Sequence, residues 1–176
     1  MVGARLANSA ALRAAIAFGA GAAAVLGFAP VDAPLVTLAA FVVLAQLWQV
    51  SPSPRAAFGT GFWFGLGLFG AGVSWVYVSL ARFGGMPPLL AGIATLGFCA
   101  VLALYPACAG WLQARAPGPA WLRATLVAPA AWTVLEWMRG WVLTGFPWLA
   151  VGYAAIDTPL AGYAPLGGVH LLTLAT

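Results

Sequence analysis

The stretch FGTGFWFGLGLFGAGVSWVYVSL, residues 58 to 80, contains no charged side chain and is rich in glycine and aromatic residues. A run of about 20 apolar residues is long enough for a helix to cross the hydrocarbon core of a bilayer. Gly61 and Gly65 form a GxxxG pair, which favours close packing against another helix. Trp75 and Tyr77 lie near the far end, where membrane helices carry interfacial aromatic residues. The stretch therefore predicts a membrane helix that packs tightly within a bundle.

The composition of the whole chain supports the same class. Only 6% of the residues are charged and 64% are hydrophobic, and the mean hydropathy is +1.00. A soluble domain carries about 25% charged residues, so we expect a polytopic membrane protein. The net charge of +4 does not indicate nucleic-acid binding, because the seven basic residues, all arginines, flank apolar runs.

The apolar runs predict an all-α transmembrane bundle with about five complete spans and a truncated sixth. A final helix of about eleven residues would be too short to cross a bilayer. We therefore expect residues 1–176 to be the N-terminal piece of a longer protein. The predicted complete spans are 12–28, 35–50, 58–80, 89–112 and 122–143, and the sixth begins near Leu166.

The first run carries Gly19, Ala23 and Gly27 at intervals of four residues, which predicts a second close-packing face. Arg5 and Arg13 precede it, so a cleaved signal peptide is an alternative. We favour an uncleaved span because further spans follow at once.

The arginines predict how the chain is oriented in the membrane. Cytoplasmic loops of membrane proteins carry an excess of Lys and Arg. If the N-terminus is cytoplasmic, only Arg82 and Arg139 fall on the outer side of the membrane. The five that fall on the cytoplasmic side are Arg5, Arg13, Arg55, Arg115 and Arg123.

The segment from Glu136 to Trp148 reads EWMRGWVLTGFPW and holds the candidate site. Glu136 and Arg139 are three residues apart, so on a helix they share a face and can pair. A structural pair is one interpretation, and the other has Arg139 binding a phospholipid phosphate. Trp132 and Leu143 would share this face, which we expect to look into the bundle.

Gly145 and Pro147 predict the end of this helix at the outer membrane boundary. Backbone at Gly145 can approach a ligand closely because glycine has no side chain. Phe146 and Trp148 could line a groove for an acyl chain. An interfacial aromatic belt with a proline turn is the alternative.

The remaining reactive side chains suggest no metal or cofactor. Cys99 and Cys108 lie nine residues apart in one apolar run, hence on opposite faces of a helix, and their spacing fits no metal motif. His170 is more typical of a packed or interfacial histidine than of a ligand. We predict no metal or cofactor site.

Several motifs together resemble one family, the apolipoprotein N-acyltransferases. The resemblance covers nearly the whole chain in order and spacing. The motifs are FGAGVSWVYVS at 69–79, FGGMP at 83–87, LY at 104–105, APAAW at 128–132, EWMRGW at 136–141, TGFPWL at 144–149, GY at 152–153, ID at 156–157 and PLGGV at 165–169.

The resemblance implies a multi-pass enzyme of the bacterial inner membrane that completes lipoprotein maturation. Such an enzyme transfers an acyl chain from a phospholipid to the N-terminal diacylglyceryl-cysteine of an apolipoprotein. The family uses a cysteine nucleophile, a glutamate base and a lysine in a periplasmic nitrilase-like domain that follows the spans. This chain has no lysine, and its cysteines lie in an apolar run, so we assign no catalytic residue and expect the chain alone to be inactive.

The resemblance therefore assigns residues 1–176 to the membrane region of such an enzyme. Gly145, Phe146, Trp148, Arg139 and Glu136 are its candidate substrate-binding residues. Two alternatives stay open at this point. One is a small transporter or channel, although no internal repeat is evident, and the other is a non-catalytic relative that binds lipid or a partner.

Overall fold

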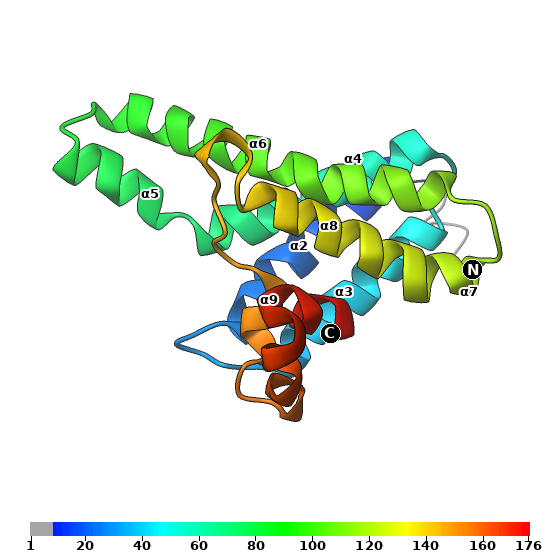
Figure 1. Ribbon diagram of the computed structural model, residues 1–176. Helices are drawn as coiled ribbons and strands as arrows, with labels where there is room; N and C mark the ends of the chain where they lie inside the picture. The colour runs from blue at the N-terminus through cyan, green and yellow to red at the C-terminus, as the bar shows by residue number, and fades with distance from the viewer. Residues whose placement is uncertain (1–8) are drawn as a thin grey trace.

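The computed structural model describes residues 9–176, and every regular element in that range is helical. The prediction of an all-α protein is thereby confirmed for these residues. The longer α-helices are α2 (Ala10–Ala24), α3 (Pro34–Gln49), α4 (Pro54–Gly72), α6 (Pro88–Arg115), α8 (Ala128–Arg139) and α9 (Ala164–Ala175). In Figure 1, α2, α4, α6 and α8 form the body of the bundle, and α9 with the segment before it lies on one side.

Short helical segments connect these helices. They are η1 (Val25–Gly27), α5 (Trp75–Val78), η2 (Ser79–Phe83), α7 (Ala120–Leu122), η3 (Arg123–Val127), η4 (Val142–Thr144), η5 (Val151–Ala155) and η6 (Pro159–Tyr163). Of these, η2 and η3 are π-helical turns. Because α7, η3 and α8 follow one another without a break, residues 120–139 form one continuous helical rod.

Helix α4 packs closely against α2 on one side and against α6 on another. A methyl group added at Gly61 would lie 2.3 Å from the carbonyl oxygen of Pro106, and one at Gly65 would lie 2.7 Å from the Cα of Ala103. A methyl group at Gly67 would lie 2.1 Å from the carbonyl oxygen of Phe18. The GxxxG prediction is therefore confirmed: these helices approach each other backbone to backbone.

The second close-packing face, predicted from the first apolar run, is confirmed at Gly27 and wrong at Gly19. Gly27 is buried, and a methyl group added there would lie 1.8 Å from Oγ1 of Thr37 on α3. Gly19 is exposed, and nothing lies within 4 Å of a methyl group added there. Gly21 faces α4 instead, where an added methyl group would lie 2.0 Å from the carbonyl oxygen of Phe64. The interval of four residues was visible in the sequence, but the crossing point of the two helices decides which glycine is covered.

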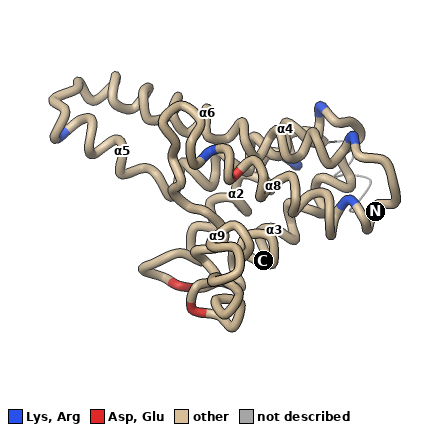
Figure 2. Tube along the Cα trace, viewed as in Figure 1, with Lys and Arg blue, Asp and Glu red and all other residues tan. Residues whose placement is uncertain are grey.

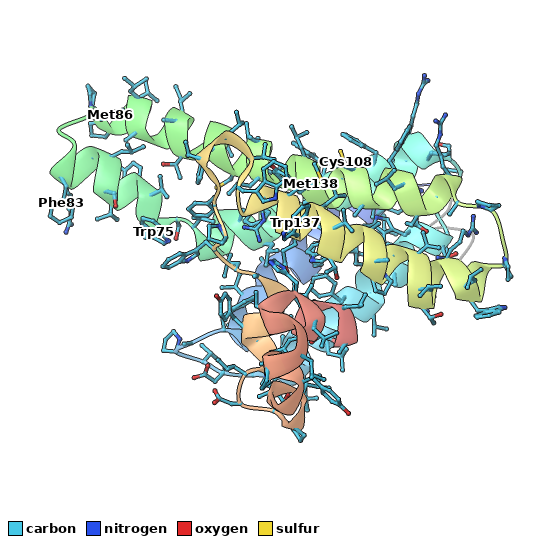
Figure 3. All side chains as sticks on the ribbon, viewed as in Figure 1. Trp75, Phe83, Met86, Cys108, Trp137 and Met138 are labelled. Carbon is cyan, nitrogen blue, oxygen red and sulfur yellow. The ribbon has the colours of Figure 1, made fainter. Side chains whose placement is uncertain are left out.

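The predicted third span bends where the sequence suggested one helix. Helix α4 begins after Ser53, whose Oγ accepts a hydrogen bond from the backbone N–H of Ala56 at 3.2 Å. It ends at Gly72, and Trp75–Phe83 continues at an angle of 51°. This second piece and the start of α6 project from the bundle, and Phe83 and Met86 lie near the tip (Figure 3). Phe83 is 86% exposed there.

Two helices in residues 9–176 are long and apolar enough to cross a membrane, namely Ala10–Gly27 and Pro88–Arg115. A third crossing results if Pro54–Gly72 and Trp75–Phe83 together make one bent span. Helix α3 is apolar but has 16 residues, and α9 has 12. The predicted count of five complete spans and a truncated sixth therefore stays a prediction.

Candidate functional site

Glu136 lies at the centre of the site, buried on α8 with 4% of its surface exposed. Its carboxylate accepts three hydrogen bonds: from the Trp132 indole N–H at 3.3 Å, the Val151 backbone N–H at 2.9 Å and the Thr173 hydroxyl at 2.6 Å. These donors come from α8, η5 and α9. A buried carboxylate satisfied in this way holds the three segments together.

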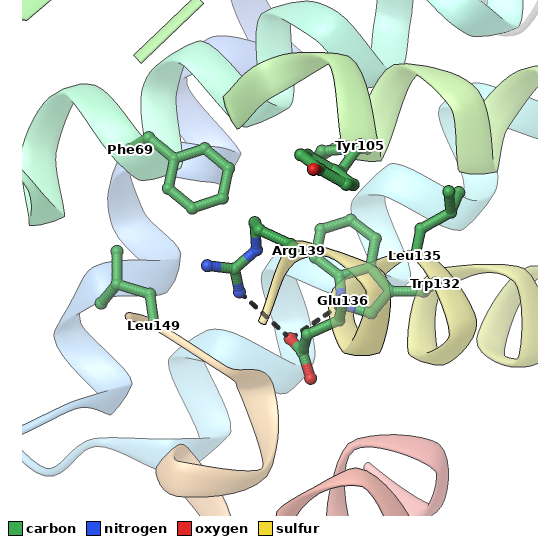
Figure 4. Close-up of a pocket in the computed structure, with 8 residues that line it drawn as sticks. Phe69, Tyr105, Trp132, Leu135, Glu136, Arg139 and Leu149 are labelled. Atoms are coloured by element: carbon green, nitrogen blue, oxygen red, sulfur yellow. Dashed lines mark hydrogen bonds and ion pairs between the residues drawn. The ribbon is translucent and has the colours of Figure 1, made fainter. Parts of the chain in front are cut away.

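Arg139 pairs with Glu136 and is equally buried, with 3% exposed. Its Nη2 lies 3.9 Å from Oε2 of Glu136, one helical turn away, as the sequence spacing predicted. The guanidinium also lies 5.2 Å from the centre of the Phe69 ring on α4, within cation–π range. Figure 4 shows this pair surrounded by Phe69, Tyr105, Trp132, Leu135 and Leu149. The cavity beside it has about 10 Å³, which leaves no room for a lipid headgroup.

Arg139 also fixes the loop that follows α8. Its Nη1 donates to the backbone carbonyl oxygens of Phe146 at 2.5 Å and Trp148 at 2.6 Å. In return, the backbone N–H of Phe146 donates to the carbonyl oxygen of Arg139 at 2.8 Å. The buried cation therefore contacts both the Glu136 carboxylate and two carbonyls of the loop.

The chain leaves the helix by a turn that requires glycine at one position. Leu143, Thr144 and Gly145 have φ values of +53°, +75° and +83°. A methyl group added at Gly145 would lie 2.0 Å from the carbonyl oxygen of Gly140, so the turn closes on itself there. The structure corrects the predicted inward face at one residue. Leu143 is 84% exposed, because α8 ends at Arg139 and its periodicity stops there.

The two aromatic side chains of the loop have different environments. Phe146 is half-buried, and its ring lies 5.0 Å from that of Phe98 on α6. Trp148 is 53% exposed, and its ring lies 5.5 Å from that of Trp75. The loop is thus attached to the bundle by Phe146 and presents Trp148 at the surface.

Trp148 lines a groove of about 650 Å³. The groove lies between the connection from α2 to α3, the end of α4, and residues 147–157. Its apolar walls include Phe28, Tyr153 and Ile156, and two carboxylates, Asp32 and Asp157, also line it. Pockets of about 300–1,000 Å³ with apolar walls and few polar groups are typical of sites for small organic ligands.

Comparison with known proteins assigns the chain to a family. Residues 20–176 match the family model described as Apolipoprotein N-acyltransferase N-terminal domain. The chain belongs to this family. It is 52% identical over 163 residues to the apolipoprotein N-acyltransferase of Nitrosomonas europaea, a match that covers 90% of this chain and 32% of that protein.

Other apolipoprotein N-acyltransferases give similar matches. The Vibrio vulnificus protein is 49% identical over 156 residues, covering 88% of this chain and 30% of the relative. The Pseudomonas putida protein is 46% identical over 166 residues, a match that covers 90% of this chain and 32% of that protein. This member of the N-acyltransferase family therefore spans about a third of the length of the curated relatives that it matches.

The structure brings the five predicted site residues of this N-acyltransferase family member onto one connected unit. Glu136 and Arg139 lie inside it, Gly145 closes the turn against Gly140, and the Phe146 ring contacts Phe98 on α6. Trp148 alone of the five lines the groove. The acyl-groove interpretation needs side chains at the surface, and of these residues Trp148 meets that condition best.

Sequence reasoning missed the groups of α9 that reach Glu136. Thr173 accepts a hydrogen bond from the Gly152 backbone N–H at 2.9 Å while donating to Glu136. His170 places Nδ1 3.9 Å from Oε1 of Glu136, and this atom is buried without a hydrogen-bond partner in residues 9–176. His170 and Thr173 are three residues apart on α9 and share a helical face. Nothing in the sequence indicated that this face would meet α8.

Proposed function

We propose that this chain forms the membrane region of an apolipoprotein N-acyltransferase, and that the groove beside Trp148 holds an acyl chain of its lipid substrate. The observation that carries the proposal is the fixed position of the Gly145–Trp148 loop. Arg139 holds the loop through two carbonyl oxygens, so the exposed Trp148 ring forms a preorganised wall of an apolar groove. A preorganised wall lowers the cost of binding a flexible chain.

The reaction proposed for the complete enzyme is the transfer of an acyl chain from a phospholipid to the N-terminal diacylglyceryl-cysteine of an apolipoprotein. The relatives that support this are named as apolipoprotein N-acyltransferases. We assign the chemistry to a nitrilase-like domain outside these 176 residues. The membrane region would present the lipid substrates to that domain.

We further propose a bacterial inner-membrane location with a cytoplasmic N-terminus. The bundle would then cross the membrane five times before the segment that contains α9. In support, the basic positions in Figure 2 gather mostly at the end of the bundle near α7. The positive-inside rule places this end in the cytoplasm, and the acidic positions in Figure 2 lie away from it.

Photolabelling tests the acyl groove directly. The chain is purified in detergent and incubated, at a low ratio of lipid to protein, with a phosphatidylethanolamine that carries a diazirine near the end of one acyl chain. After irradiation, labelled peptides are mapped by mass spectrometry. We expect labelling in residues 25–32 and 147–157 that unlabelled phosphatidylethanolamine competes away.

A matched pair of variants separates the groove from general apolar surface. Ile156→Lys places a charge in the groove, and Leu166→Lys changes another exposed aliphatic residue that does not line it. Labelling of residues 147–157 should fall in Ile156→Lys and persist in Leu166→Lys. Equal labelling of both variants, or labelling without competition, would show that the lipid covers this surface without occupying a site.

A further inference from the structure

A second cavity, of about 170 Å³, lies where α3 leads into α4 and where α6 ends. It is separate from the acyl groove and shares no lining residue with it. Most of its lining is polar, and the polar side chains are Gln49, Ser51, Ser53, Gln113 and Arg123.

Two hydrogen-bond donors in the wall of this cavity have no partner. Nε of Arg123 and Nε2 of Gln49 are both buried and make no hydrogen bond within residues 9–176. The one hydrogen bond between the two side chains, from Arg123 Nη2 to Gln49 Oε1, is long at 3.4 Å. A buried donor left unsatisfied costs about 1–3 kcal/mol, and more when the group is charged. A ligand with acceptor atoms would remove this cost.

The charge of Arg123 is also unbalanced within the cavity. The chain has three acidic residues, Asp32, Glu136 and Asp157, and none of them lines the cavity. The N-terminus of the 19-residue helix α4 lies in its wall, through Ser53 and Pro54, and adds partial positive charge. The Ser53 hydroxyl oxygen accepts a hydrogen bond from the backbone N–H of Ala56, and within residues 9–176 its proton remains available for donation to a ligand. The cavity thus combines positive charge with donors on several sides.

A water molecule would satisfy the donors but leave the guanidinium charge unbalanced. We propose that this cavity binds a phosphate group, either from a phospholipid headgroup or from a free phosphate ion. A phosphate offers several acceptor oxygens to donors that converge from different elements, and the arginine fork suits it. The volume of about 170 Å³ exceeds the roughly 30 Å³ that one water occupies in the liquid, so a larger group fits.

Thermal unfolding in detergent tests this proposal with two probes. The chain is titrated with sodium phosphate or with dihexanoyl phosphatidic acid, each against sodium chloride at equal ionic strength. A ligand that binds the folded state raises Tm with concentration. A rise with both probes identifies a site open to free phosphate, and a rise with the phosphatidic acid alone identifies a lipid headgroup site. No rise above chloride with either probe would overturn the proposal.

Variants locate the site. Arg123→Gln should weaken binding at least about tenfold, because a hydrogen bond to a charged group is lost. Gln49→Leu removes a neutral donor and should weaken phosphate binding less than Arg123→Gln does. Arg115→Gln is the matched control, since the Arg115 guanidinium stacks 4.4 Å from the Trp111 ring and does not line the cavity. If Arg123→Gln and Gln49→Leu both respond to the probes like wild type, the proposal is wrong.

Discussion

The guanidinium of Arg139 donates a hydrogen bond of 2.6 Å to the backbone carbonyl oxygen of Trp148, nine residues further along the chain. The position of the exposed indole is therefore set by a charge that is itself buried against Glu136. Loss of either charge should act on the loop without changing the side chains that line the groove.

Replacement of Arg139 tests this relationship. Arg139→Met leaves the Glu136 carboxylate buried without a cation and the Phe146 and Trp148 carbonyls without their donor. We expect the free energy of unfolding to fall by about 3–5 kcal/mol, as when one partner of a buried pair is removed. Chemical or thermal unfolding in detergent measures this loss. The double variant Glu136→Gln/Arg139→Met should recover part of it, whereas a loss no greater than that of exposed Arg115→Gln would contradict the assignment.

Substitution of Gly145 tests the turn. Gly145→Ala meets the Gly140 carbonyl at a positive φ, so we expect a loss of at least about 1 kcal/mol and weaker photolabelling of residues 147–157. Gly97→Ala is the control, because nothing lies within 4 Å of the added methyl group. Cys99→Ala and Cys108→Ala should leave labelling unchanged. Wild-type stability and labelling in Gly145→Ala would refute this account of the turn.

A pair of glycines on α4 tests the packing of the bundle. Gly67→Ala forces the methyl group against the Phe18 carbonyl oxygen of α2, while the same change at Gly70 meets nothing within 4 Å. We expect Gly67→Ala to lower Tm in detergent. Gly70→Ala should raise the free energy of unfolding by about 0.5–1 kcal/mol, because alanine loses less conformational freedom than glycine. Equal effects at the two positions would argue against backbone contact between these helices.

The proposed orientation is tested by cysteine accessibility in cells. Single cysteines at positions 84 and 117 are introduced into a Cys99→Ala/Cys108→Ala background and treated with a membrane-impermeant thiol reagent. We expect labelling of Gly84→Cys from outside the inner membrane and protection of Pro117→Cys. The reverse pattern would place the N-terminus on the periplasmic side.

The expected lack of activity in the isolated chain is tested by an acyl-transfer assay. Residues 1–176 contain no lysine, and Cys99 and Cys108 are free thiols on α6, a candidate membrane span. We therefore expect no N-acylation of a diacylglyceryl peptide above background, measured by mass spectrometry. Turnover that disappears in Cys99→Ser or Cys108→Ser would show that a thiol of this region is the nucleophile.

The features predicted correctly from the sequence are those that local spacing determines. Residues three or four apart on a helix share a face as long as the helix continues. The Glu136–Arg139 pair and the close packing of Gly61 and Gly65 against another helix could therefore be predicted. The prediction that Leu143 lies on the same inward face was wrong, because the helix ends before this residue. The turn at Gly145 was visible because glycine and proline interrupt helices.

The features that the sequence did not reveal depend on contacts between distant segments. Thr173 reaches Glu136 across 37 positions, and the Val151 N–H across 15. No periodicity within α8 or α9 encodes these distances. The choice of Gly21 over Gly19 likewise depends on the crossing angle of two helices. In the same way, the donors of Gln49 and Arg123 that lack a partner within residues 9–176 come together only because α3 and η3 approach each other, 74 positions apart in the chain.

The close contacts of α4 also constrain how the protein is assembled in the membrane. Helix α2 is synthesised before α4, yet Gly21 and Gly67 show that its tight packing surface is formed by α4. Helix α6 likewise requires Gly61 and Gly65 to be in place. Insertion of α4 therefore provides the surface against which α2, already made, can pack, and against which α6, made afterwards, packs in turn. Until that step, an early intermediate would expose the face of α2 that carries Gly21 to lipid or to the insertion machinery.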